Sequence, residues 1–122
     1  MLALLFFACS SAHVSSSVED CKDYDFTGEQ ESTLESSVDG SKGDVWRTYV
    51  ERDNTDDAFA PDIVDDGGVI SVYEAWDKGS DGNPMCMEPH VTLSDMSGEI
   101  EVRWYLDAGD SVPFETVRVQ AG

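Results

Sequence analysis

The stretch EIEVRWYLD, residues 99–107, alternates polar and apolar side chains more cleanly than any other part of the chain. Successive side chains of a β-strand point to opposite faces of a sheet, so a period of two predicts a strand with one buried face. The positions expected to face inward are Ile100, Val102, Trp104 and Leu106. The rest of the fold is then expected to cover this face.

Shorter patterns of the same kind lie on both sides of this stretch. We expect four more strands, over residues 45–51, 69–77, 85–94 and 115–120. Turn-forming residues such as 78–84 separate them, and no helical period of ten or more residues is present. The sequence therefore predicts an all-β fold, a small antiparallel β-sandwich of immunoglobulin-like architecture with five to seven strands.

Two of these strands carry more specific expectations. Trp46 and Val50 share a parity, and both are expected on the buried face of their strand. Pro89 has no backbone N–H to donate, so the strand that contains it is expected to have an edge or a bulge there.

Acidic residues dominate the chain, with 26 Asp and Glu against 7 Lys and Arg and a formal net charge of −19. The Ser- and Glu-rich stretch 19–43 and the Asp-rich stretch 53–68 are polar enough to predict loops. A field of this sign repels nucleic acid, so nucleic-acid partners are not expected. Three explanations of the acidity stay open: solubility in high salt, binding of Ca²⁺ or a basic partner, and an ordinary solvated surface.

The N-terminus carries a different signal. Residues 2–8 read LALLFFA, an apolar run shorter than the roughly 20 residues that span a bilayer but typical of an export signal. The segment LFFAC, residues 5–9, resembles the lipobox of bacterial lipoproteins. Ala8 is the small residue before the cysteine, and Phe6 stands where that family prefers a branched aliphatic residue. The resemblance covers only this segment and implies that Cys9 is lipidated and anchors the protein in a membrane.

Two other interpretations of this terminus stay open. Ser10 and Ala12 also fit ordinary signal cleavage after Ala12, which gives a secreted protein, and the apolar run also fits a strand of a cytosolic protein. In the lipoprotein interpretation, residues 1–8 are a signal segment, residues 9–20 a disordered Ser-rich spacer, and residues 21–122 the acidic sandwich domain.

Three cysteines are an odd number for an exported protein. Lipidation of Cys9 leaves Cys21 and Cys86 to pair in a disulfide. Such a bond closes a loop of about 65 residues and stabilises the fold by roughly 3–4 kcal/mol on the chain-entropy model. The alternative is two free thiols.

Calcium is the metal that the oxygen-bearing side chains favour. Two groups are candidate ligands: Asp77, Asp81 and Asn83, and separately Asp62, Asp65 and Asp66. The first group resembles the first half of an EF-hand loop, whose alternating oxygens converge on one ion, although no flanking helices are predicted. The second group lies among carboxylates with no base between them. The alternatives are a hairpin turn and a solvated loop.

Tyrosines offer a second kind of site. Tyr49, Tyr73 and Tyr105 have the parity opposite to the apolar faces of their strands, so they are expected to face outward. Three rings on one sheet face could stack on sugar rings or form part of a protein interface. The alternative is scattered exposed tyrosines.

The residues needed for catalysis are sparse. A nucleophilic Ser or Cys needs a positioned base, and the predicted sandwich holds one histidine, His90. The sequence contains neither a Gly-x-Ser-x-Gly nor a His-Glu-x-x-His motif.

We therefore predict an exported, lipid-anchored cell-surface protein that acts as a binding or structural module and not as an enzyme. Its expected partners are the membrane and a cell-surface protein or polysaccharide, with no cofactor other than Ca²⁺. Two alternatives are a Ca²⁺-dependent polysaccharide- or protein-binding domain and an extracytoplasmic enzyme with a carboxylate-based site.

Overall fold

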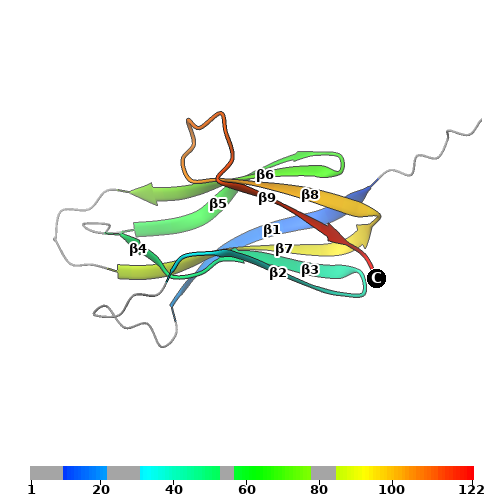
Figure 1. Cartoon of the computed structure of the whole chain (residues 1–122), viewed down its shortest axis with the longest axis horizontal. Coiled ribbons are helices and arrows are strands. Elements are labelled where there is room, and N and C mark those ends of the chain that lie inside the picture. Colours follow the sequence, from blue (N-terminus) through cyan, green and yellow to red (C-terminus); the bar gives the residue numbers. More distant parts are fainter. Residues whose placement is uncertain (1–9, 22–30, 53–56, 78–84) are drawn as a thin grey trace, which may run out of the picture.

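The computed structural model describes residues 10–21, 31–52, 57–77 and 85–122, and in these ranges the chain is all-β. The strands form two sheets that face each other as a sandwich (Figure 1). The predicted fold class is therefore confirmed. The described residues form nine strands, which is more than the five to seven expected.

One sheet has five strands: β1 (Ser11–Asp20), β2 (Leu34–Asp39), β3 (Lys42–Arg47), β4 (Val50–Arg52) and β7 (Met85–Ser97). Their order is β1-β7-β3-β2, with β4 also paired to β7. The other sheet has four strands, in the order β5 (Asp57–Asp66), β6 (Val69–Asp77), β8 (Glu99–Tyr105) and β9 (Glu115–Gln120).

The pair β6 and β8 is parallel, whereas every other pair in the described sheets is antiparallel. The sandwich is thus antiparallel as predicted, with this one parallel pair as an exception. The chain leaves β6, crosses to the other sheet to form β7, and returns as β8. The chain reverses its direction twice, between β6 and β7 and between β7 and β8, so β8 runs parallel to β6.

The core lies between the two sheets, and β8 supplies its centre. Ile100, Val102 and Trp104 are fully buried, and Leu106 is partly buried against them, which confirms the predicted inward face. Burying a side chain of this size contributes about 1.5–3 kcal/mol. The other buried members of the cluster are Leu34, Val45, Ile70, Val72, Val91, Leu93, Met96 and Val119.

Residues 11–20 form strand β1, so the prediction of a disordered spacer is wrong for them. β1 pairs with β7 along almost its whole length, and Ala12 and Val14 pack against the core. The Oγ of Ser16 donates a hydrogen bond of 2.6 Å to the carbonyl oxygen of Pro61 in β5. The period of two was present in the sequence, but the serine content masked it.

Two stretches predicted as loops also contain strands. β2 lies within the Ser- and Glu-rich stretch and forms a hairpin with β3. β5 occupies most of the Asp-rich stretch and pairs with β6. Within β5, Pro61 is buried and Ile63 packs against the core, so alternate residues still give the strand one buried side.

An irregularity between β3 and β4 decides which residues face the core. Tyr49 has a φ of 45°, in the left-handed region that few non-glycine residues adopt. This break shifts the alternation, so Val45 and Val50 are both buried, although residues five positions apart in a regular strand face opposite sides of the sheet. Trp46 therefore lies on the outer face, and the prediction that it faces inward with Val50 is wrong.

Pro89 lies opposite this break. Pairing of β3 with β7 ends at His90, and pairing of β4 with β7 starts at Met87. On this side of β7, neither strand pairs with Pro89, so the ladder is interrupted at the proline, where the sequence predicted an edge or a bulge. On the other side, β1 continues past it, with Val18 opposite Pro89.

A disulfide joins Cys21 to Cys86, which confirms the predicted pairing, with the Cα atoms 5.4 Å apart. Cys21 directly follows β1, and its backbone N–H donates a hydrogen bond of 3.2 Å to the carbonyl oxygen of Cys86. The disulfide therefore links two neighbouring strands of one sheet. This position differs from the inter-sheet disulfide of immunoglobulin domains.

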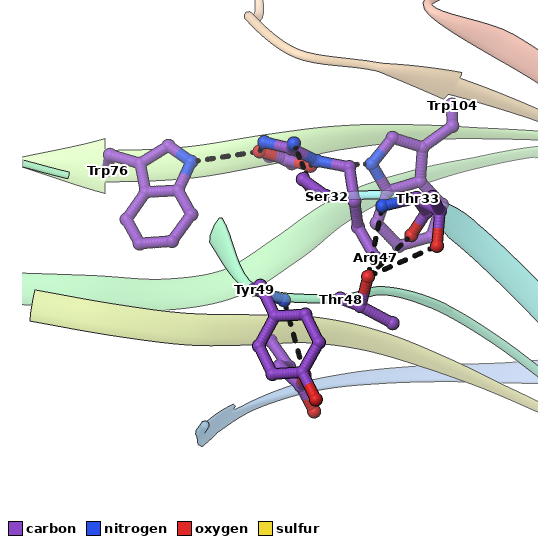
Figure 2. A network of polar contacts seen from close by, with 9 residues as sticks. Ser32, Thr33, Arg47, Thr48, Tyr49, Trp76 and Trp104 are labelled. Carbon is purple, nitrogen blue, oxygen red and sulfur yellow. Dashed lines mark hydrogen bonds and ion pairs between the residues drawn. The ribbon is translucent and has the colours of Figure 1, made fainter. Parts of the chain in front are cut away.

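A buried ion pair connects the two sheets. Glu74 of β6 is 3 % exposed, and its carboxylate accepts hydrogen bonds from Nε and Nη2 of Arg47 on β3 (Figure 2). The indole Nε1 atoms of Trp104 and Trp76 donate to the same carboxylate, at 2.6 and 3.2 Å. Four donor atoms thus satisfy a carboxylate that is costly to bury without partners.

Candidate binding groove

The outer face of the five-stranded sheet carries an open cavity of about 270 Å³. We call this cavity the outer-face groove. Its lining residues come from four strands: Glu19 of β1, Ser37 of β2, Asp44 and Trp46 of β3, and Glu88 and His90 of β7. Because rigid paired strands supply every lining residue, the geometry of the groove is set by the sheet and not by a loop.

Strand register brings these residues together. Glu19 lies directly opposite Glu88, Ser37 opposite Asp44, and Trp46 opposite His90. Residues directly opposite in neighbouring strands have Cβ atoms about 4.5–5.5 Å apart, so their side chains meet on one face. That face is the outer one because the alternating positions of β3 and β7, such as Val45 and Val91, are buried in the core.

An aromatic pair lines part of the groove. The rings of Trp46 and His90 stack with centroids 5.7 Å apart and an angle of 11° between their planes. His90 Nε2 lies 3.0 Å from Asp44 Oδ1, and the Thr92 hydroxyl donates to the same oxygen at 3.4 Å. Because an ionised carboxylate only accepts, Nε2 of His90 carries the proton in this contact. Asp44 thereby fixes the orientation of the imidazole beside the indole.

The other two carboxylates flank this pair. Glu88 is half-buried, and its Oε2 accepts a hydrogen bond of 3.2 Å from the backbone N–H of Tyr49. The left-handed backbone at Tyr49 aims this N–H at the carboxylate, so the irregularity of the sheet also shapes the groove. Glu19 is exposed beside Glu88.

The candidate calcium ligands are not brought together in the described part of the chain. Asp81 and Asn83 lie outside the described residues, and Asp77 is described only as the last residue of β6. Asp62, Asp65 and Asp66 are exposed on β5, where the pleat places Asp65 on the face opposite to the other two. Within the described ranges, no group of three or more His, Cys, Asp or Glu has the arrangement to hold a metal ion.

The three candidate tyrosines divide between the two sheets. Tyr73 and Tyr105 lie opposite each other on β6 and β8 and stack, with ring centroids 4.5 Å apart. Tyr49 lies between β3 and β4 in the other sheet. The prediction of three tyrosines on one sheet face is therefore wrong. Tyr105 is also only 8 % exposed, which leaves Tyr73 as the accessible ring of the stacked pair.

Cys9, the candidate lipidation site, lies outside the described residues. Sequence reasoning also did not predict the outer-face groove, because it expected Trp46 in the core and gave His90 no binding role. Each strand did carry a signal, because Asp44 and Trp46 share a parity, as do Glu88 and His90. Their convergence depends on a strand order in which β7 inserts between β1 and β3, and no local pattern predicts that order.

The chain matches no protein-family model, no curated protein and no solved structure. The part of the chain that the structure describes contains no helix of the length and hydrophobicity needed to cross a membrane. The class that the fold and the groove define is an acidic, disulfide-bonded β-sandwich with a concave aromatic and carboxylate surface on one sheet.

Proposed function

We propose that this protein is an exported, lipid-anchored module of the cell surface that acts by binding, with the outer-face groove as its ligand site. The observation that carries the proposal is the cavity of about 270 Å³ in which Trp46 and His90 stack among three carboxylates. Concave sites that combine an aromatic surface with a few placed polar groups are the usual form of ligand sites in proteins.

The disulfide supports the compartment. Bonds of this kind form and persist in oxidising environments outside the cytoplasm. Pairing of Cys21 with Cys86 leaves one cysteine, Cys9, for the lipid that the N-terminal segment implies.

The start of β1 favours processing at Cys9 over processing after Ala12. Cleavage before Cys9 leaves β1 whole, because the strand begins at Ser11. Cleavage after Ala12 removes the first two residues of the strand, and Ala12 packs against the core. Mass spectrometry of the native N-terminus tests this point: we expect a diacylglycerol adduct on Cys9, and an unmodified N-terminus at His13 would contradict it.

The binding role is tested by titrating the full chain with soluble polysaccharides and with basic and neutral peptides. Intrinsic fluorescence reports binding because Trp46 lines the groove. We expect at least one probe to bind, and we expect Trp46→Ala to weaken that binding by about tenfold or more, a change of 1.4 kcal/mol.

Tyr73→Ala is the matched control, because it removes an aromatic ring from the outer face of the other sheet. We expect this variant to bind like the parent chain. Binding that is lost in Tyr73→Ala and retained in Trp46→Ala would contradict a role for the groove and would favour the four-stranded sheet.

A further inference from the structure

We propose that the outer-face groove binds the side chain of an arginine displayed by a basic partner protein. This inference rests on the proposed function and names the chemistry of its ligand. Four observations support it, namely the aromatic pair in the lining, the charge of the lining, the size of the cavity and the charge of the whole chain.

The aromatic pair offers the indole of Trp46 to a planar cation. A guanidinium placed over an indole is attracted by the ring quadrupole. Trp46 is only partly buried and lines the groove, and its stacking on His90 holds the ring in place. Asp44 in turn holds His90, so the platform is oriented before a ligand arrives.

The described lining holds three carboxylates and no Lys or Arg side chain. Glu19 and Glu88 lie directly opposite each other, an arrangement in which like charges destabilise a sheet. Within the described part of the chain, the Glu19 carboxylate has no hydrogen-bond or ion-pair partner, and Glu88 accepts only a backbone N–H. A cation between the two carboxylates relieves this repulsion.

The three arginines whose side chains the structure describes are all paired elsewhere. Arg47 is paired with buried Glu74, Arg103 with Glu101, and Arg118 with Glu99 and Glu101. None of these side chains lines the groove. None of these three arginines is therefore the cation of the groove, and we assign that part to another molecule.

Size and shape favour arginine. A volume of about 270 Å³ lies below the roughly 300–1,000 Å³ of pockets that enclose drug-sized ligands, and it suits a single long side chain. The planar guanidinium stacks on aromatic rings and donates to carboxylates through a fixed fork, whereas the lysine ammonium is a strongly hydrated point charge. The net charge of −19 steers a basic partner toward this surface.

The test is fluorescence anisotropy of the full chain with three labelled peptides of one sequence, in which a central residue is arginine, lysine or citrulline. Citrulline has the shape of arginine without its charge. At fixed ionic strength, we expect the arginine peptide to bind about tenfold or more tightly than the citrulline peptide, and the lysine peptide to lie between them.

The double variant Glu19→Gln with Glu88→Gln is expected to bind the arginine peptide about tenfold more weakly than the parent chain. Its control is Asp107→Asn with Glu115→Gln, which removes two exposed carboxylates outside the groove and changes the net charge equally. We expect that control to bind within about twofold of the parent chain. The first variant removes a repulsive pair, so its melting temperature should be no lower than that of the parent.

The outcomes separate this inference from the proposed function. Equal binding of the citrulline and arginine peptides, or equal loss in the two charge variants, overturns the arginine inference. If a neutral oligosaccharide binds and Trp46→Ala abolishes that binding, the groove is a sugar site: the proposed function stands and this inference falls. If Trp46→Ala affects no probe, both fall.

Discussion

At the scale of single residues, Glu74 has the environment that is hardest to predict from the sequence. It occupies an inward position of β6, between buried Val72 and partly buried Trp76, in a stretch that otherwise looks apolar. Arg47 has the same anomaly on β3. A charged residue at an inward position of two strands indicates a buried pair, but only the packing of one sheet on the other identifies the partners.

Loss of one partner of this pair is expected to lower the free energy of unfolding strongly. Arg47→Ala leaves the carboxylate of Glu74 buried without its cationic donor, and such changes cost about 3–5 kcal/mol. Urea unfolding measures the change in the free energy of unfolding. The control is Arg118→Ala, whose side chain is 64 % exposed and pairs with surface glutamates, so its cost should stay below about 1 kcal/mol. Equal costs for the two variants would contradict a structural role for the buried pair.

A second prediction at this scale concerns the contribution of the disulfide to stability. Replacing Cys21 and Cys86 by serine frees a loop in the unfolded chain with a sequence separation of 65 residues. On the chain-entropy model, the free energy of unfolding should fall by roughly 3–4 kcal/mol. Cys9→Ser, measured in the same urea series, should leave it unchanged. A disulfide variant as stable as the parent chain would show that this bond does not constrain the unfolded state.

At the scale of elements, sequence reasoning succeeds where one face of a strand is strongly apolar. β8 was predicted with its buried face because Ile100, Val102 and Trp104 leave no other interpretation. β1 and β5 were missed because serine and aspartate dominate their composition, although alternate positions still face the core. Composition reports how polar a strand is, whereas parity reports which side is buried, and the second determines the fold. The groove was missed for another reason, since it depends on strand order.

The structural role of β1 can be tested with two adjacent substitutions that add the same charge. Val14 packs against the core, while Ser15 faces outward and is exposed. Val14→Asp is expected to lower the free energy of unfolding by about 2 kcal/mol or more, because it loses apolar burial and places a charge toward the core. Ser15→Asp should change it by no more than about 0.5 kcal/mol. Equal effects in urea unfolding would support a flexible segment in place of a strand.

At the scale of the whole molecule, charge sets the conditions under which the fold is stable. A net charge of −19 on 122 residues produces a self-repulsion that opposes the compact state. Some of this repulsion is local, as between Glu19 and Glu88, and some is spread over the surface. Dissolved cations screen both parts, with a Debye length of about 10 Å at 0.1 M salt and about 3 Å at 1 M.

The melting temperature is therefore expected to rise steadily as NaCl increases from low concentration to the molar range. A gain of 1 kcal/mol in a domain of 60–100 residues raises the melting temperature by about 4–8 °C, and we expect a rise of at least this size. A second series adds millimolar CaCl₂ or a chelator at constant NaCl. Screening predicts little response to either. A saturable rise with calcium that Asp65→Ala abolishes would instead identify a specific cation site and would contradict screening as the source of the stabilisation.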